Sequence, residues 1–192
     1  MSIDVPPPVI SGVTPEEYLA REVLAETRSE YVNGKIIPMT GASERHCLIA
    51  MNLSYQLRKA IGNEHFRTYL NDLKTRTENG SYRYPDLVVL QPPPKFQVGR
   101  KDIIANPLVI FEILSPATEA NDRGEKFADY RSIESLQAYI LVSQDKPSIE
   151  CFSRQSDDSW KLLAVTKGDF SIPPLDCSIN LSDVYQHVEF EE

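Results

Sequence analysis

The chain has 192 residues and a formal net charge of −8, with 41% hydrophobic and 25% charged residues. This composition fits a globular protein with a hydrophobic core, and it argues against a protein that grips phosphate backbones through a general surplus of positive charge. No apolar run approaches the roughly 18–20 residues of a membrane span, and residues 1–12 lack the basic and apolar regions of a signal peptide, so we expect a cytoplasmic protein. Cys47, Cys151 and Cys177 are too widely spaced for a zinc site, and we expect reduced, mostly buried thiols.

The N-terminal region divides into an arm and the start of the fold. Residues 1–12 contain Pro6-Pro7-Pro8, and we expect a flexible arm there, because proline has no backbone donor and fixes φ. One domain should then cover residues 13–192. Thr14-Pro15 is typical of an N-cap followed by proline at the first helical position, which predicts a helix from residue 14 to about residue 26.

A hairpin and a long helix follow. Residues 30–39 contain Asn33-Gly34, a two-residue type I′ turn signal, and therefore predict a β-hairpin. A second helix is predicted over residues 44–61, with Gly62 as its stop. Its predicted apolar side consists of Leu48, Met51, Leu53, Tyr55, Leu57 and Ile61.

Two strands joined by a turn come next. Residues 66–77 are predicted to form one strand, which Asn79-Gly80 turns into a second strand over residues 84–90. Pro92-Pro93-Pro94 ends that strand, because three prolines cannot continue a ladder. We expect the segment up to residue 105 to lie on the surface, either as a plain connector or as a partner-binding or lid element.

The C-terminal half alternates strand, helix and strands. Residues 107–114 predict a buried strand, and residues 121–133 predict a helix after the break at Ser115-Pro116. Three more strands are predicted over residues 138–143, 149–154 and 160–165. This order of elements predicts a mixed α/β or α+β fold.

Two carboxylates, Asp86 and Glu112, stand alone in the predicted apolar strands. Because strand side chains alternate between faces, Asp86 shares a face with Val88, and Glu112 shares a face with Ile110. An ionised carboxylate buried without a partner is costly enough that it normally neutralises, pairs with a cation or binds a metal. Two such acids suggest a shared cation.

These acids belong to a wider pattern. Pro85-Asp86 followed by Glu112-Ile113-Leu114 resembles the PD-(D/E)XK nuclease motif, in which two acids on adjacent strands hold magnesium and a lysine positions or activates water. A longer series of segments resembles the Uma-type restriction-endonuclease family over nearly the whole chain after the proline arm. Each segment is weak alone, but their shared order and spacing make coincidence unlikely. In chain order, the segments are Glu30–Ile36, His46, Tyr84–Val89, Phe111–Thr118, Asp122, Lys126, Tyr130 and Ala138–Val142.

The resemblance implies a restriction-endonuclease-like fold, with a central mixed sheet flanked by helices, and a DNA endonuclease that depends on magnesium or manganese and forms a homodimer. Asp86 and Glu112 would hold the metal, with the backbone carbonyl of Ile113 as a further ligand, since hard cations prefer oxygen. Leu114 occupies the position of the motif's lysine, and an apolar side chain cannot do that work. The resemblance offers Lys126, from the helix after the second acidic strand, as the catalytic lysine.

Asp122, Lys126 and Tyr130 recur at intervals of four and so project from one face of the predicted helix. If that face packs over the acids, Lys126 enters the site and Tyr130 orients it or a phosphate. The alternative is an exposed ion pair between Asp122 and Lys126, with Tyr130 in the core.

Two further residues are candidates for supporting roles. Glu30 resembles the extra acid that several nucleases of this fold contribute from their N-terminal region; the alternative is an exposed glutamate at a strand end. His46, near the start of a helix, could contact a phosphate or a metal-bound water, or could make a local hydrogen bond.

Lys74 is a candidate for a purely structural role. It should lie across the hairpin from Asp86 and could neutralise it, although this salt bridge would leave Glu112 unexplained. Lys74 also belongs to a local basic cluster with Arg67, Arg76 and Arg83, which we interpret as a solvated surface.

A noncatalytic nuclease-like module that binds a protein or a nucleic acid is the alternative to an enzyme. The leucine at position 114 and the acidic net charge favour the module. Asp86, Glu112 and Lys126 favour the enzyme.

Overall fold

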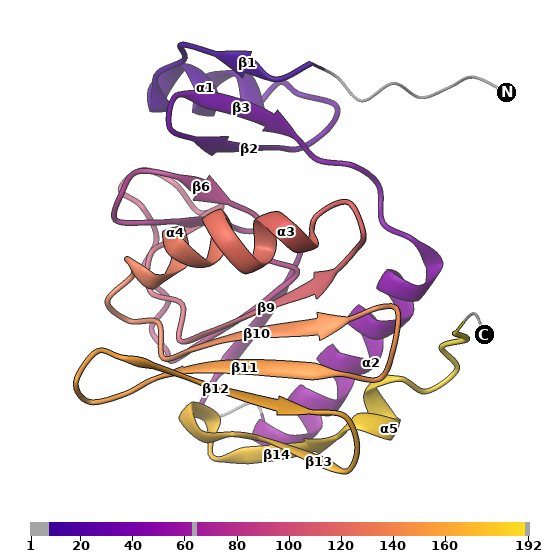
Figure 1. The fold of residues 1–192 in the computed structure, drawn as a ribbon. Helices are drawn as coiled ribbons and strands as arrows, with labels where there is room; N and C mark the ends of the chain where they lie inside the picture. The colour runs from indigo at the N-terminus through magenta and orange to yellow at the C-terminus, as the bar shows by residue number, and fades with distance from the viewer. Residues whose placement is uncertain (1–7, 63–64, 191–192) are drawn as a thin grey trace, which may run out of the picture.

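The computed structural model describes residues 8–62 and 65–190. Two six-stranded mixed sheets lie one above the other, with helices on their faces (Figure 1). This mixed α+β architecture confirms the predicted fold class. Residues 1–7 of the expected arm lie outside the described residues, while Ile10–Ser11 within it forms strand β1 and pairs with β3.

The core sheet has the strand order β12-β11-β10-β9-β7-β4. Its strands are β4 (Arg67–Leu70), β7 (Leu87–Leu90), β9 (Val109–Leu114), β10 (Ala138–Ser143), β11 (Ile149–Arg154) and β12 (Trp160–Val165). The last three have the predicted bounds. β9 and β10 pair in parallel, with Glu112 opposite Leu141, and the other neighbours pair antiparallel. Because a parallel pair needs a crossover connection, the segment between β9 and β10 folds as a helix on the sheet face.

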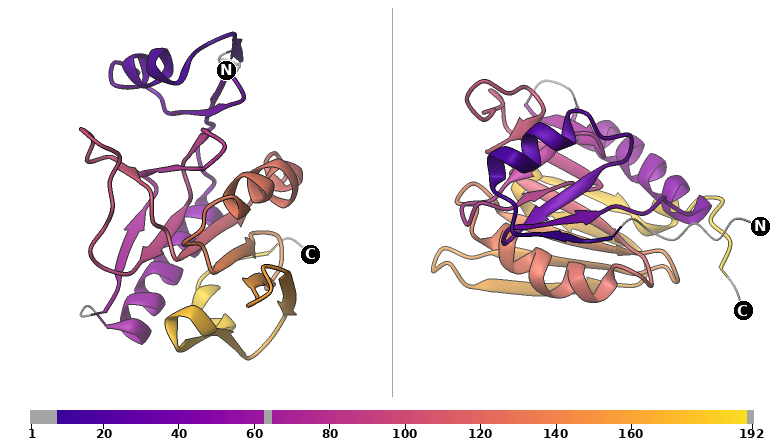
Figure 2. Two further views of the ribbon diagram at one scale, coloured as in Figure 1. Left: turned by 90° about the vertical axis from the view of Figure 1, so that its left-hand side faces the viewer. Right: turned by 90° about the horizontal axis from the view of Figure 1, so that it is seen from above.

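Helices cover the core sheet on both faces (Figure 2). One face carries α2 (Glu44–Ile61), with β13 (Asp169–Ile172), the short 3₁₀ helix η2 (Pro173–Leu175), β14 (Cys177–Asn180) and α5 (Leu181–Val184). The other face carries α3 (Glu119–Asn121), the π-helical segment η1 (Asp122–Lys126) and α4 (Phe127–Arg131). The crossover helix therefore begins two residues before the predicted start and contains a π-helical turn. None of the helices in the described part of the chain is long and apolar enough to cross a membrane.

Helix α2 has the predicted bounds, and its caps explain them. The side chain of Ser43 accepts a hydrogen bond from the backbone N–H of His46, and Gly62 ends the helix with a φ of 65°. The prediction for its apolar side is partly wrong: Met51 and Tyr55 are 69% and 64% exposed. Residues two apart lie about half a turn apart on a helix, so Met51 and Tyr55 point away from the stripe that packs on the sheet.

The N-terminal sheet has the strand order β1-β3-β2-β6-β5-β8. Its strands β2 (Ser29–Val32), β3 (Lys35–Pro38), β5 (Lys74–Arg76), β6 (Tyr82–Arg83) and β8 (Ile103–Ile104) are accompanied by helix α1 (Pro15–Glu22). Asn33 and Gly34 have φ values of 48° and 76°, which confirms the type I′ turn. Thr14 and Glu17 form a capping box at the start of α1, and the helix ends at Glu22, earlier than predicted.

The predicted strand 66–77 is divided between the two sheets, and the predicted strand 84–90 joins the core sheet only from Leu87. The first breaks after Leu70, where Asn71 has a φ of 46°, and the second runs through Tyr84-Pro85-Asp86 between β6 and β7. The backbone N–H of Asn71 donates to the carbonyl of Asp86 at 3.0 Å, which ties the two bends together. Asp86 therefore lies where the chain passes from the N-terminal sheet to the core sheet.

Two smaller expectations are wrong. Ile103 and Ile104, in the predicted surface segment, are fully buried, because β8 pairs with β5. The three cysteines are free as expected, but Cys47 is exposed and only Cys151 is fully buried.

We predict that Leu53→Ala lowers the free energy of unfolding by about 2–5 kcal/mol, because Leu53 is fully buried on the side of α2 that packs against the core sheet, and the substitution leaves a cavity there. Met51→Ala, on the exposed side of the same helix, should change it by less than about 0.5 kcal/mol. Urea denaturation of both variants measures the difference. Equal losses would contradict the orientation of α2.

Candidate active site

The candidate site lies on the face of the core sheet that α4 covers. Ile110 and Leu114 of β9 pack there with Phe127 and Tyr130 of the crossover helix, and Glu112 alternates onto the same face. Leu114, in the position of the motif's lysine, is 4% exposed within this hydrophobic cluster. The crossover helix thus faces Glu112, which is the condition on which the expected entry of Lys126 into the site depends.

Lys126 is buried among acids. Its Nζ lies 2.8 Å from Oε1 of Glu112, 3.5 Å from Oε1 of Glu30 and 3.6 Å from Oδ1 of Asp122. The Lys126 side chain is 8% exposed, so the exposed ion pair considered as the alternative is not what forms. One ammonium therefore joins the N-terminal sheet, the core sheet and the crossover helix.

Tyr130, one helical turn after Lys126, also contacts Glu112. Its hydroxyl donates to Oε1 of Glu112 at 3.0 Å, and its ring is fully buried. Tyr130 thus contacts the carboxylate that Lys126 also binds, and its role in orienting the lysine or a phosphate stays a prediction. The same Glu112 oxygen accepts from both Lys126 and Tyr130.

Asp86 is bound to the neighbouring strand and to α2. Its Oδ2 accepts a hydrogen bond from the backbone N–H of Ile113 at 2.7 Å, and its Oδ1 lies 3.0 Å from Nε2 of His46. The N–H and C=O of a strand residue point to the same side, so the carbonyl of Ile113 faces the gap beside Asp86. His46 is thus linked to the site by its contact with Asp86. The sequence alone did not decide between this contact and the other roles considered for His46.

Arg83 is the site residue that sequence reasoning missed. It was interpreted as part of a solvated basic cluster, yet its side chain is completely buried. Its guanidinium donates to Oε2 of Glu30 at 2.8 Å and to Oδ2 of Asp129 at 2.6 and 2.8 Å. The backbone N–H of Tyr84 donates to the other oxygen of Glu30 at 3.0 Å. A lone arginine in the alternating stretch Ser81–Pro85 carries no signal of such burial.

Lys74 lies outside the site. Its Nζ pairs with Oδ2 of Asp102 at 2.9 Å and packs over the ring of Tyr84. The expected salt bridge across the hairpin to Asp86 is therefore wrong, because the two bends place Lys74 on the N-terminal sheet beside β8.

The pKa values of the cluster are set by burial and by the closeness of several acids to one lysine. Burial raises the pKa of Glu112 well above its usual range against the pull of Lys126, and the charges of Asp86 and Asp122 raise it further. Burial alone would lower the pKa of Lys126, but Glu112, Glu30, Asp122 and Asp86 together raise it, so the lysine stays protonated. Burial opposes the ionisation of Glu30, yet Lys126 and Arg83 hold its pKa below the usual range.

The acids of the cluster line one cavity. Its volume is about 800 Å³, and its walls include Glu30, Asp86, Glu112, Asp122 and Lys126, together with His46 and Ile113. These residues come from both sheets, from the start of α2 and from the crossover helix. The residues predicted for the site are therefore brought together, with Lys74 as the exception.

The donor set fits a hard divalent cation. The described residues contain no group of three or more histidine, cysteine, aspartate or glutamate side chains placed around one point. Magnesium does not require such a group, because it keeps several waters and is commonly held by one or two carboxylates. Four carboxylates act on the single ammonium of Lys126. Burial is the main cause of the raised pKa of Glu112 and of Asp122, and neighbouring acids raise both values further. Asp86, Glu112 and the Ile113 carbonyl suit such a cation.

Residues 15–183 match a family model described as "Uma2: Putative restriction endonuclease". The chain belongs to the Uma2 family. Two proteins of Synechocystis sp. are similar to it. Uncharacterized protein sll1609 is 36% identical over 151 residues, which cover 78% of this chain and 85% of that protein. Uncharacterized protein slr1290 is 31% identical over 180 residues, which cover 93% of this chain and 94% of that protein. The family resemblance drawn from the sequence segments is therefore confirmed.

The fold is shared with a solved structure. A protein of Anabaena variabilis, described as a putative nuclease belonging to DUF820, superposes with a TM-score of 0.72 over 90% of this chain and 97% of that chain, at 19% sequence identity. At this identity the likeness concerns the fold. Family and fold together support a nuclease role for this Uma2 protein.

We predict that Arg83→Met lowers the free energy of unfolding by about 3–5 kcal/mol, because the substitution leaves Glu30 and Asp129 buried without their cation. Arg123→Met is the matched control, since Arg123 also pairs with two carboxylates, Glu119 and Glu150, but is partly exposed. Arg123→Met should lower the free energy of unfolding by less than about 1 kcal/mol. A similar loss for both variants in urea denaturation would contradict the buried role of Arg83.

Proposed function

We propose that the chain is a divalent-metal-dependent DNA endonuclease that hydrolyses phosphodiester bonds. In this proposal, Asp86, Glu112 and the Ile113 carbonyl hold magnesium or manganese, and Lys126 is the catalytic cation. The observation that carries the proposal is the burial of Lys126 at 2.8 Å from Glu112, in a cavity that Asp86 also lines.

The residues of the site suit two parts of the hydrolysis, namely the binding of a metal ion and the stabilisation of negative charge. The reaction joins a water oxygen to phosphorus and breaks the bond to the leaving oxygen, which takes up a proton. A bound divalent ion supplies Lewis-acid stabilisation and lowers the pKa of water. Lys126 remains an ammonium, so it stabilises negative charge that develops on the phosphoryl oxygens and does not act as the general base.

The surrounding residues keep the acids in place. Tyr130 donates to Glu112, the Ile113 N–H donates to Asp86, and His46 lies beside the other oxygen of Asp86. Glu30 is bound by Arg83 and by the backbone of Tyr84, and it lies 3.5 Å from the Lys126 ammonium. We assign Glu30 the role of positioning that ammonium.

A homodimer is part of the proposal, as the family resemblance implies. Two copies can place one site on each strand of duplex DNA, which a double-strand cut requires.

We predict that the purified protein nicks or linearises supercoiled plasmid DNA when magnesium or manganese is present and not when EDTA is present. Asp86→Asn and Glu112→Gln should abolish cutting, because each removes one charged ligand. Lys126→Met should lower the rate by about 10²–10³-fold, the usual cost of losing one group that stabilises the transition state. Gel electrophoresis of the plasmid over time measures all three.

Glu119→Gln serves as the control, since Glu119 is an acid of the neighbouring α3 that pairs with Arg123 outside the cluster. It should cut like the wild type. Cutting that survives both Asp86→Asn and Glu112→Gln would contradict the assigned site. A well-folded protein that binds DNA and never cuts it would favour the noncatalytic module.

A further inference from the structure

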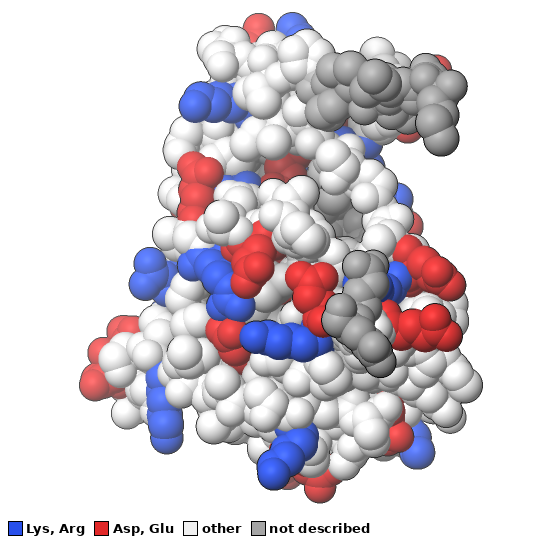
Figure 3. Space-filling model, turned by 45° about the vertical axis from the view of Figure 1, so that its right-hand side comes forward, with Lys and Arg blue, Asp and Glu red and all other residues white. Residues whose placement is uncertain are grey.

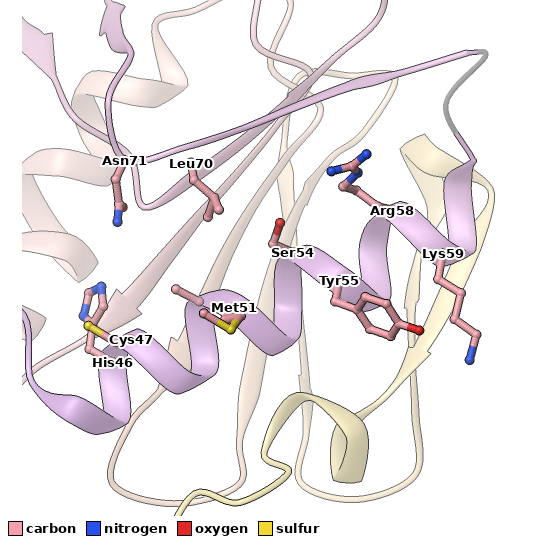
Figure 4. A pocket seen from close by; sticks show the side chains of 10 residues that line it. His46, Cys47, Met51, Ser54, Tyr55, Arg58, Lys59, Leu70 and Asn71 are labelled. Atoms are coloured by element: carbon pink, nitrogen blue, oxygen red, sulfur yellow. The ribbon is translucent and has the colours of Figure 1, made fainter.

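A second cavity runs along the exposed side of α2. Its volume is about 690 Å³, and we call it the α2 groove. Its main walls are Met51, Tyr55, Arg58 and Lys59 of α2, with Leu70 and Asn71 at the end of β4 (Figure 4). His46 and Asn71 line both this groove and the active-site cavity, so the two are adjacent.

The middle of the α2 groove is apolar and open. Met51 is 69% exposed, Tyr55 is 64% exposed and Leu70 is 41% exposed. These three belong to the ten large apolar side chains that are exposed among the described residues. The buried stripe of the same helix already packs against the core sheet, so this exposed side adds nothing to the hydrophobic core.

The far end of the α2 groove is positively charged. Arg58 and Lys59 lie there, about 20 Å along the helix axis from His46 at ~1.5 Å per residue. Within α2, which is described throughout, Glu44 is the one acid, against the three basic residues Arg45, Arg58 and Lys59. The chain as a whole has a net charge of −8, and acidic and basic side chains are interspersed on the described surface in Figure 3. The far end of the α2 groove therefore carries two basic side chains, with no acid among the described residues that line the groove.

We propose that the α2 groove binds an unpaired strand of nucleic acid that leads into the active site. This inference rests on the proposed function and concerns an unpaired strand that continues from the DNA held at the active site. Basic groups at one end match phosphates, and Tyr55 and Met51 offer an exposed aromatic ring and an exposed thioether on which bases can stack. The groove is long enough for about six stacked nucleotides at ~3.4 Å each.

The apolar lining favours a single strand over a duplex. A duplex turns its phosphates outward and keeps its base faces stacked inside, so it has nothing to offer Met51, Tyr55 and Leu70. An unpaired strand exposes both its phosphates and its base faces. The combination of charge and apolar surface in the α2 groove therefore fits an unpaired strand.

The test is a binding measurement made in EDTA, where cutting is blocked. Fluorescence anisotropy of a labelled oligothymidylate and of the corresponding duplex gives both dissociation constants for each variant of the full chain. Tyr55→Ala should weaken binding of the single strand by about 5- to 100-fold, as expected for the loss of one stacking platform, and leave the duplex unaffected. Arg58→Gln combined with Lys59→Gln should lower the salt dependence of log Kd by about 1.4, because each phosphate contact on a single strand contributes ~0.7.

Controls separate this proposal from the proposed nuclease function. Lys161→Gln removes an exposed lysine from β12, at the opposite edge of the core sheet, and should bind the strand like the wild type. Glu112→Gln should cut no DNA and still bind the strand. If the wild type never cuts DNA but binds the single strand, and Tyr55→Ala weakens that binding, the nuclease proposal is contradicted and the α2 groove proposal is supported.

Three results would overturn the α2 groove proposal. The first is a wild type that does not bind the single strand, or a Tyr55→Ala variant that binds it unchanged. The second is equal weakening of single-strand and duplex binding by Tyr55→Ala. The third is a change in oligomeric state caused by Tyr55→Ala in analytical ultracentrifugation, which would assign the groove to a second copy of the chain.

Discussion

The ammonium of Lys126 is the charge around which the site is organised. A lysine buried this deeply is stable as a cation only because Glu112, Glu30 and Asp122 lie within 3.6 Å of it. Burial raises the pKa of Glu112 in this arrangement, and the charges of Asp86 and Asp122 raise it further against the pull of Lys126. A cluster of this kind is stable in the folded chain because other groups donate to it.

A second buried cation, Arg83, links the N-terminal sheet to the crossover helix. It joins Glu30 of the N-terminal sheet to Asp129 of the crossover helix, so the N-terminal sheet can present Glu30 to Lys126. The π-helical turn over Asp122–Lys126 belongs to the same region, and such turns are frequent at functional sites. The bend at Asp86 completes the arrangement. Fold and site are thus coupled: the chain crosses between sheets where the chemistry is proposed to occur.

The parts of the structure that could be predicted are those that short sequence patterns determine. Ser43 and Gly62 cap α2, and Asn33-Gly34 fixes the hairpin, so these elements could be placed from a few neighbouring residues. The alternation of β9 placed Glu112 on the correct face, and the family resemblance drew attention to Lys126. The division of a long hairpin between two sheets depends on non-local pairing, such as that of β5 with β8, which no short pattern encodes. Arg83 was missed for the same reason, because both of its partners lie about fifty residues away in the sequence.

The most direct test of the account is the position of manganese in a crystal of the wild-type protein, read from its anomalous scattering. The account predicts a peak in the active-site cavity beside the carboxylates of Asp86 and Glu112, and no such peak in crystals of Glu112→Gln. A cavity without a peak at saturating manganese, with Lys126 still bound to Glu112, would contradict the claim that these buried acids form a metal site.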